Sequence, residues 1–273
     1  MQTETASPIE PAFDVESFEV LNKYFGKDKN HVYYEANTIE KGAVDLASFH
    51  VKNNEYMPWV GLDKKHAYTF EKVYGKSKKG VKAIIIVGAD PKTYTHTDWD
   101  WANDGKNRFY KFKMIPGDYE TFEILNESFS KDKNTVFHQN GNNLNAIPAD
   151  LATFETLGKG PIAKDKSNVY CMSYKDNSEN NLVTIALNTG DTVANLNDIY
   201  LKVGENIYHW GELVKEIDAE SFEIVSYHYG KDKNHVFYRG LVLEDADAAT
   251  FGILEKGGIG DKDGLFREGK RIE

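Results

Sequence analysis

The chain has 273 residues, of which 40% are hydrophobic, so it can bury a sizeable core. Its formal net charge of −10 argues against nucleic acid or an anionic membrane as the main partner, because both bind basic surfaces. The one cysteine, Cys171, excludes an internal disulfide and a cysteine-based zinc site. The longest apolar run, Ala83 to Val87, is too short to cross a bilayer, so no membrane insertion is expected.

A short opening motif recurs along the chain: an aspartate, two variable residues, a serine or threonine, and an aromatic residue. Counting one degenerate copy at residue 191, the copies start near residues 14, 45, 90, 118, 150, 191, 218 and 247. A second aspartate usually follows fourteen residues later, as from Asp14 to Asp28. This regularity predicts one repeat domain over residues 12–273, after a flexible polar lead at residues 1–11.

Each repeat has the residue types of short strands and turns. The opening aspartate is expected to cap a single helical or 3₁₀ turn that places the aromatic residue in the core. β-favouring runs such as residues 18–21 and 31–34 predict strands on either side of a polar turn. The second aspartate, as at Asp28, is expected to accept a hydrogen bond from the backbone two residues on.

Three residues after this turn aspartate the chain usually has glycine, asparagine or histidine, which are enriched at positive φ. We therefore predict a left-handed residue at this position. His31, His66 and His235 are accordingly assigned to backbone geometry rather than to catalysis.

The fold class expected from this pattern is all-β, with about eight tandem short hairpin or three-strand repeats in an open, curved array. The alternative is a β-propeller, but repeats of roughly 28–32 residues are short beside the 40–50 of a typical blade. The charged segment 267–271 could serve as the polar cap that an open array requires.

Two insertions interrupt the pattern, at residues 69–89 and 171–190. Both follow the strand aromatic, so they should emerge at the same point of the repeat and on the same side. The first is basic and includes Lys76, Lys78 and Lys79. The insertions are interpreted either as solvated hairpin extensions or as a face that contacts a partner.

The third repeat departs from the pattern at residues 95–101, where other repeats have apolar residues. On a strand, His96, Asp98 and Asp100 would share one face and Trp99 the other. Such a face could be a polar recognition patch or a charged edge strand. It could also bind a cation, but like-facing positions lie about 6.5–7 Å apart, so a further ligand would be needed and no metal site is assigned. Trp99 stands where other repeats have polar residues, which is typical of a contact anchor.

The segment from Asp28 to Tyr34 reads Asp-Lys-Asn-x-Val-Tyr-Tyr, and with it the chain resembles the bacterial DKNYY family, named for such a motif. Residues 232–238 match with phenylalanine for the first tyrosine, and residues 132–138 depart further, ending in Phe-His. The resemblance covers most of residues 14–273. It implies a bacterial accessory protein built of repeats, and it carries over no catalytic residue.

No glycine-rich phosphate loop and no Gly-x-Ser-x-Gly nucleophile motif occurs, so neither enzymatic activity nor a cofactor is expected. The preferred hypothesis is a bacterial protein-binding module, in a concrete version an immunity or inhibitor protein that binds a basic toxin or enzyme. Its predicted contact residues are His96, Asp98, Trp99, Asp100, Lys76, Lys78 and Lys79.

Two alternatives remain open. One is a surface-glycan or cell-wall binder that uses Trp99, Trp59 and Tyr56. The other is a propeller-type hydrolase with His96, Asp98 and Asp100 at its site. The compartment also stays open between the cytoplasm and, where a signal has been removed, the periplasm or cell surface.

Overall fold

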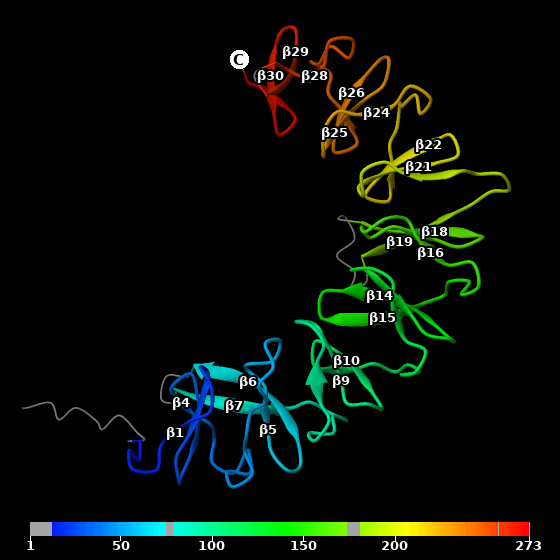
Figure 1. The fold of residues 1–273 in the computed structure, drawn as a ribbon. Coiled ribbons are helices and arrows are strands. Elements are labelled where there is room, and N and C mark those ends of the chain that lie inside the picture. Colours follow the sequence, from blue (N-terminus) through cyan, green and yellow to red (C-terminus); the bar gives the residue numbers. More distant parts are fainter. Residues whose placement is uncertain (1–12, 75–78, 174–180, 256, 273) are drawn as a thin grey trace, which may run out of the picture. The chain divides into compact units, whose positions relative to one another are not determined.

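The computed structural model describes residues 13–74, 79–173, 181–255 and 257–272 (Figure 1). These residues form strands and turns and contain no helix. Accordingly, none of the described segments is a helix that could span a membrane. The strands form eight small antiparallel sheets in tandem, seven with four strands and one with three, and each sheet is open. The prediction of an all-β chain with eight repeats is therefore confirmed, although most repeats have four strands rather than two or three.

Contacts divide the chain into two compact bodies, residues 1–120 and 121–273. The first body holds three sheets, which run from blue to green-cyan in Figure 1. Its strands are β1 (Glu19–Val20), β2 (Phe25–Lys27), β3 (Val32–Tyr34) and β4 (Asn37–Thr38), then β5 (Gly61–Leu62), β6 (Ala67–Tyr74) and β7 (Lys79–Ile85), then β8 (Thr95–His96), β9 (Trp101–Asn103), β10 (Arg108–Tyr110) and β11 (Lys113–Met114).

The second body holds five sheets, in each of which neighbouring strands follow the order of the chain. Their strands are β12 (Glu123–Ile124), β13 (Phe129–Lys131), β14 (Val136–Asn140) and β15 (Asn143–Ile147); β16 (Glu155–Thr156), β17 (Ala163–Lys164), β18 (Asn168–Met172) and β19 (Leu182–Ala186); β20 (Val193–Asn195), β21 (Tyr200–Val203), β22 (Asn206–His209) and β23 (Glu212–Leu213); β24 (Glu223–Ile224), β25 (Tyr229–Lys231), β26 (Val236–Tyr238) and β27 (Leu241–Val242); β28 (Gly252–Ile253), β29 (Ile259–Asp261), β30 (Gly264–Arg267) and β31 (Lys270–Ile272).

In the repeats that have a turn aspartate, this residue is the centre of a hydrogen-bond network, whereas the sixth repeat has Val203 at that position. In the first repeat, Asp28 Oδ1 accepts hydrogen bonds from the backbone N–H groups of Asn30 and His31, both at 2.7 Å. Its Oδ2 accepts from the N–H of Asp14 at 3.0 Å and from the Tyr33 hydroxyl at 2.6 Å. The predicted side-chain-closed turn is confirmed, and the fourteen-residue spacing follows from the bond between the two aspartates.

The two lysines of the Lys-Asp-Lys-Asn signature have different structural roles. Lys29 pairs with the opening aspartate of its own repeat, Asp14. Lys27 reaches the next repeat, where its Nζ donates to the carbonyl oxygen of Phe49 at 3.3 Å. Lys231 makes the equivalent bond to Phe251 at 2.8 Å. The signature therefore closes one repeat and joins it to the next.

The prediction of left-handed residues at the Asp-Lys-Asn turn is wrong, because none of His31, His66 and His235 has a positive φ. The Asp28 carboxylate and a backbone bond from Asp28 N–H to the His31 carbonyl close the turn with ordinary φ values. Left-handed pairs occur instead in the hairpin between the third and fourth strands, which they close as type I′ turns. These pairs are Glu35–Ala36, Lys111–Phe112, Trp210–Gly211, Arg239–Gly240 and Glu268–Gly269.

The opening aromatic residue of a repeat packs into the core of the repeat before it. The ring centroids of Phe49 and Phe25 lie 5.7 Å apart, and those of Phe251 and Tyr229 are separated by the same distance. Phe49 and Phe251 are each only 1% exposed. Neighbouring repeats therefore share their cores, as expected for a tandem array in which no repeat buries its apolar face alone.

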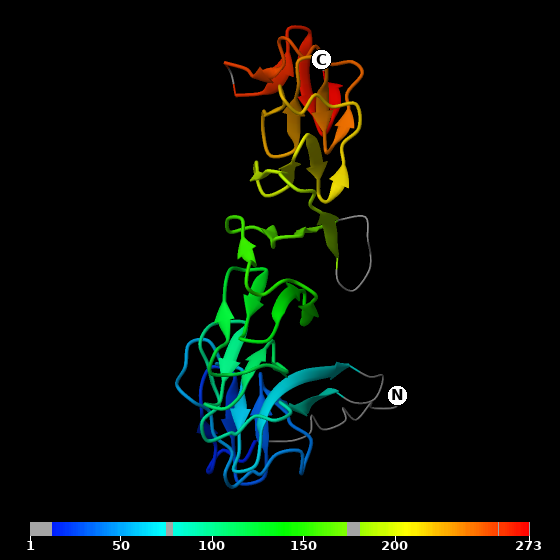
Figure 2. The same ribbon diagram turned by 90° about the vertical axis from the view of Figure 1, so that its right-hand side faces the viewer.

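Both insertions lengthen the last hairpin of their sheets, which corresponds to the third and fourth strands of a four-stranded repeat. The first extends β6 and β7, which pair from Tyr68↔Ile85 to Tyr74↔Lys79, and Figure 2 shows this hairpin in cyan extending beyond the shorter strands near it. The second extends β18 and β19. The interpretation as hairpin extensions is confirmed for the described residues of both insertions.

Candidate functional site

Three aromatic side chains of the first body form a cluster, here called the aromatic patch: Tyr56, Trp59 and Trp99. The Trp59 and Trp99 rings are stacked, with centroids 5.4 Å apart and planes 14° from parallel. Tyr56 meets Trp99 edge to face at 5.7 Å. Trp99 is 59% exposed, whereas the other two rings are half-buried. The patch is thus a preformed aromatic surface rather than a core.

The loop before β5 holds Tyr56 and Trp59 in place. Met57 and Val60 from this loop are buried at 1% and 0%, which leaves Tyr56 and Trp59 at the surface. The Asn54 side chain fixes the loop against the third repeat, because its Nδ2 donates to Thr95 Oγ1 and to the His96 carbonyl oxygen, both at 3.0 Å.

Trp99 lies in a turn between β8 and β9, and the predicted continuous strand over residues 95–101 is wrong. Asp98 Oδ1 accepts hydrogen bonds from the N–H groups of Asp100 at 2.8 Å and Trp101 at 2.9 Å, which folds the backbone back on itself. His96, Asp98 and Asp100 therefore do not form a ladder on one strand face. Trp101 is buried, whereas Trp99 is exposed, as predicted.

His96 is buried, at 4% exposure, and its side chain does not reach the surface. Its Nδ1 lies 3.1 Å from the carbonyl oxygen of Asp98 and its Nε2 lies 3.1 Å from the Tyr94 hydroxyl. Because a carbonyl only accepts, Nδ1 carries the proton and Nε2 accepts from Tyr94. Burial lowers the pKa of His96, so the ring is neutral and serves the packing of this repeat.

Two carboxylates, Glu55 and Asp98, lie near Tyr56 of the aromatic patch. A hydrogen bond to Glu55 raises the pKa of the Tyr56 hydroxyl, and the charge of Asp98 adds to this effect. Asp100 lies on the other side of Trp99 in the sequence, and its Oδ2 is 3.9 Å from Lys111 Nζ. An exposed indole between acidic side chains is suited to a cationic group, which is attracted by the ring face and by the carboxylates.

The side chains of the three predicted lysine contacts lie outside the described residues. Lys76 and Lys78 lie outside the described residues, and so does the side chain of Lys79, whose backbone begins β7. Of the predicted contact residues, Trp99 packs against Trp59 and Tyr56 with Asp98 nearby, Asp100 lies near Lys111, and His96 is buried in the core.

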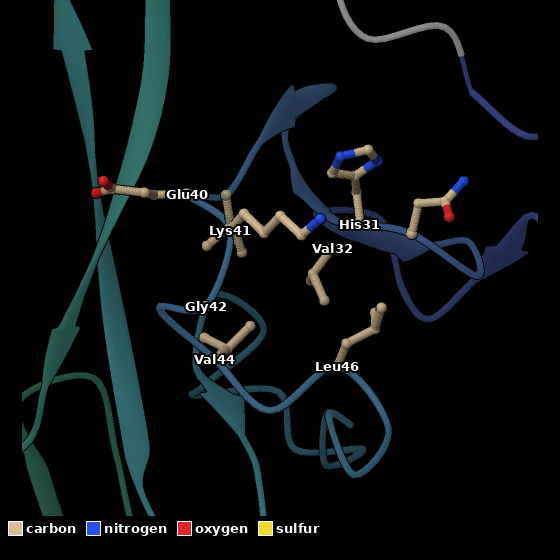
Figure 3. Close-up of a pocket in the computed structure, with 9 residues that line it drawn as sticks. His31, Val32, Glu40, Lys41, Gly42, Val44 and Leu46 are labelled. Atoms are coloured by element: carbon tan, nitrogen blue, oxygen red, sulfur yellow. The ribbon is translucent and has the colours of Figure 1, made fainter.

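A cavity of about 240 Å³ lies at the junction of the first and second repeats (Figure 3). It is lined by Asn30, His31, Val32, Ile39, Glu40, Lys41, Gly42, Val44 and Leu46. Figure 3 shows Val32, Val44 and Leu46 pointing into it, Lys41 extending across it toward His31, and Glu40 pointing away. This cavity was not predicted from the sequence, because the linker between the first and second repeats carries no recognisable motif.

A second cavity occupies the equivalent place between the sixth and seventh repeats. It has a volume of about 510 Å³, and its lining includes Asn206, Val214, Lys215, Glu216 and Ile217. Counted from the turn, Asn206 corresponds to His31, Val214 to Ile39 and Glu216 to Lys41. The repeat architecture thus produces a recess at these two junctions and varies the charge on its rim.

Other reactive side chains are engaged in packing. Burial raises the pKa of the Cys171 thiol to about 12, so this residue stays protonated near neutral pH. Within the described ranges, no three His, Cys, Asp or Glu side chains lie together in a way that could hold a metal ion.

Among the comparisons with known proteins, a family model matches this chain. Neither the curated proteins nor the solved structures include a match to this chain. The model of the DKNYY family matches residues 5–141 and again residues 141–270, which is consistent with the tandem architecture. Two successive matches thus cover nearly the whole sequence, and the chain belongs to the DKNYY family.

Proposed function

We propose that this protein is a non-catalytic binding module whose contact surface is the aromatic patch with the adjacent carboxylates of Glu55, Asp98 and Asp100. The observation that carries the proposal is Trp99, which is 59% exposed yet held in place by Trp59 and by the Asp98 turn. Rigid, exposed tryptophans are enriched among the residues that dominate protein–protein binding energy.

The charge of the patch indicates the kind of partner. A basic side chain, above all arginine, would stack on the exposed indole of Trp99 and pair with Asp98 or Asp100. The net charge of −10 would also accelerate encounter with a basic protein. A bacterial immunity or inhibitor protein that blocks a basic toxin or enzyme is the concrete version of this proposal.

Affinity capture from a lysate of the source organism tests the proposal. The full chain should retain a basic protein at low salt and lose it as salt rises, and Trp99→Ala should weaken binding of the purified partner by roughly 30-fold. Asp98→Asn should also weaken binding, since asparagine can close the same turn but carries no charge.

Tyr227 supplies a matched control. It is an aromatic residue at the position of the seventh repeat equivalent to Trp99, and it is 57% exposed. Tyr227→Ala should leave binding unchanged. If no protein is retained at low salt, or if Tyr227→Ala and Trp99→Ala reduce binding equally, the aromatic patch is not the contact surface.

Glycan binding is the second candidate, favoured by the grouping of Trp59, Trp99 and Tyr56 on one surface. Aromatic rings of this kind can stack on the apolar faces of sugars. A cell-wall polysaccharide column distinguishes the two functions, because glycan retention would depend on Trp99 but would change little with salt.

A further inference from the structure

We propose that the cavity beneath Lys41 binds a small aliphatic carboxylate, a function separate from that of the aromatic patch. The cavity has an apolar interior and a cationic rim, and its volume of about 240 Å³ suits a ligand smaller than a typical drug-like molecule.

The interior is formed by aliphatic side chains from both repeats. Val32 and Ile39, from the first repeat, are 3% and 2% exposed. Val44 and Leu46, from the start of the second repeat, are half-buried and point into the cavity. A branched aliphatic group would bury its surface against these residues, which favours binding by the hydrophobic effect.

The rim supplies a cation for the carboxylate. Lys41 is exposed, and within the described part of the chain no carboxylate lies within ion-pair distance of its Nζ. Figure 3 shows its side chain crossing the cavity, while the carboxylate of Glu40 points away. An ammonium group over an apolar recess would form a charge-assisted hydrogen bond with a ligand carboxylate whose alkyl group lies below.

The other side of the rim is His31, and its setting does not oppose this binding. His31 Nδ1 lies 3.9 Å from Asp28 Oδ1, the nearby carboxylate. The Asp28 side chain is 0% exposed and accepts hydrogen bonds through both oxygens. It is therefore occupied by the turn and does not present its charge to the cavity.

The equivalent cavity of the second body has a net acidic rim, although Lys215 also lines it. Glu216 stands at the position of Lys41, and Glu205 and Asp218 also line that cavity. A carboxylate would be repelled there. The second cavity thus serves as a control for the first. One aliphatic carboxylate should bind per chain, in the cavity between the first and second repeats.

Titration of the full chain with 4-methylpentanoate, followed by methyl chemical shifts, tests the proposal. We expect shifts at Val44 and Leu46 with a Kd on the order of 1 mM, as suits a ligand of few atoms. The matched neutral amide, 4-methylpentanamide, should bind about tenfold more weakly, because it cannot form the ion pair.

Two variants localise the binding. Lys41→Met keeps the length of the side chain and should weaken binding of the acid about tenfold, to the level of the amide. Val44→Trp should fill the cavity and abolish binding. Lys65→Met, which removes a lysine of the second repeat that does not line the cavity, should have no effect.

Circular dichroism confirms that each variant is folded before its affinity is compared. Binding of the amide as tight as that of the acid, full affinity in Lys41→Met, or shifts at Ile217 rather than Val44 would overturn the proposal. So would the absence of any shift at about 20 mM ligand, well above the expected Kd.

Discussion

Asparagine in place of Asp63, the turn aspartate of the second repeat, should destabilise the protein although the two side chains have the same shape. Asp63 is 2% exposed. Its Oδ1 accepts from the N–H groups of Lys65 and His66, at 2.7 and 2.9 Å. Its Oδ2 accepts from the Asp45 N–H at 2.9 Å and from the Tyr68 hydroxyl at 2.8 Å.

The cost follows from replacing one oxygen by an amino group. In Asp63→Asn the amide oxygen can keep the two bonds from Lys65 and His66, and the Tyr68 hydroxyl can rotate to accept from the new NH₂. The Asp45 N–H then faces another donor and loses its partner. An unsatisfied buried N–H together with the loss of charge assistance lowers the free energy of unfolding by about 2–4 kcal/mol.

The pH dependence gives a second readout. Burial alone would raise the pKa of Asp63, but hydrogen bonds from the backbone of Asp45, Lys65 and His66 and from Tyr68 outweigh it and lower the pKa. A carboxyl whose pKa is lowered by folding stabilises the protein above its unfolded pKa of about 3.9, and this stability is lost as pH falls below that value. In Asp63→Asn the free energy of unfolding should therefore fall less steeply as the pH is lowered, because the contribution of this carboxylate is absent.

Urea unfolding followed by tryptophan fluorescence measures the effect, since Trp59, Trp99 and Trp101 all lie in the first body. Tyr68→Phe is the matched control: it removes the hydroxyl that bonds Asp63 and His66 but leaves the Asp45 N–H satisfied, and it should cost only about 1 kcal/mol. Phenylalanine is compatible with the fold there, because Phe109 and Phe237 occupy the equivalent position. An Asp63→Asn protein as stable as wild type would refute the role of the carboxylate as the centre of the turn.

Two further changes test the packing within single repeats. His138 is 0% exposed, and burial lowers its pKa to about 4. Protonation of the ring should therefore lower the free energy of unfolding by roughly 3 kcal/mol as the pH falls from about 6.5 to 4. His138→Phe should abolish that loss when urea unfolding is measured as a function of pH. In Gly61→Ala the new Cβ would lie 2.5 Å from the Phe49 ring, so the urea midpoint should fall with a loss of about 1–3 kcal/mol; an unchanged midpoint would show that the ring can move aside.

The sequence predicted the parts of the repeat better than the bonds between them. The spacing of Asp14 and Asp28 indicated two capping aspartates, and both form the turns expected of them. The hydrogen bond from the Asp14 N–H to the Asp28 carboxylate was not evident from the sequence. Every residue except proline has a backbone N–H, so the type of residue does not reveal which N–H acts as the donor. The same reason concealed the bond from Lys27 to the Phe49 carbonyl.

The left-handed hairpin was missed for a different reason. A search for glycine, asparagine or histidine favours the Asp-Lys-Asn turn, whereas the positive φ values occur at Glu35 and Ala36. These residues carry no sequence signal for a type I′ turn. The tight pairing of Tyr34 with Asn37 imposes the conformation, so tertiary context overrides the local preference.

The turn at Asp98 is a scaffold position that forms part of the proposed binding surface. Asn22 and Asn126 stand at the same position, and each closes its turn with Oδ1 while its Nδ2 donates to a carbonyl oxygen of the following repeat, at Pro58 and Gly160. Asp98 keeps the turn but has no Nδ2 to donate, and it brings a negative charge beside Trp99. A structural amide is thus replaced by a carboxylate next to the most exposed aromatic ring of the patch. The exchange gives up a hydrogen bond to the following repeat and gains a negative charge beside an exposed indole, which supports the proposal of a basic partner at this surface.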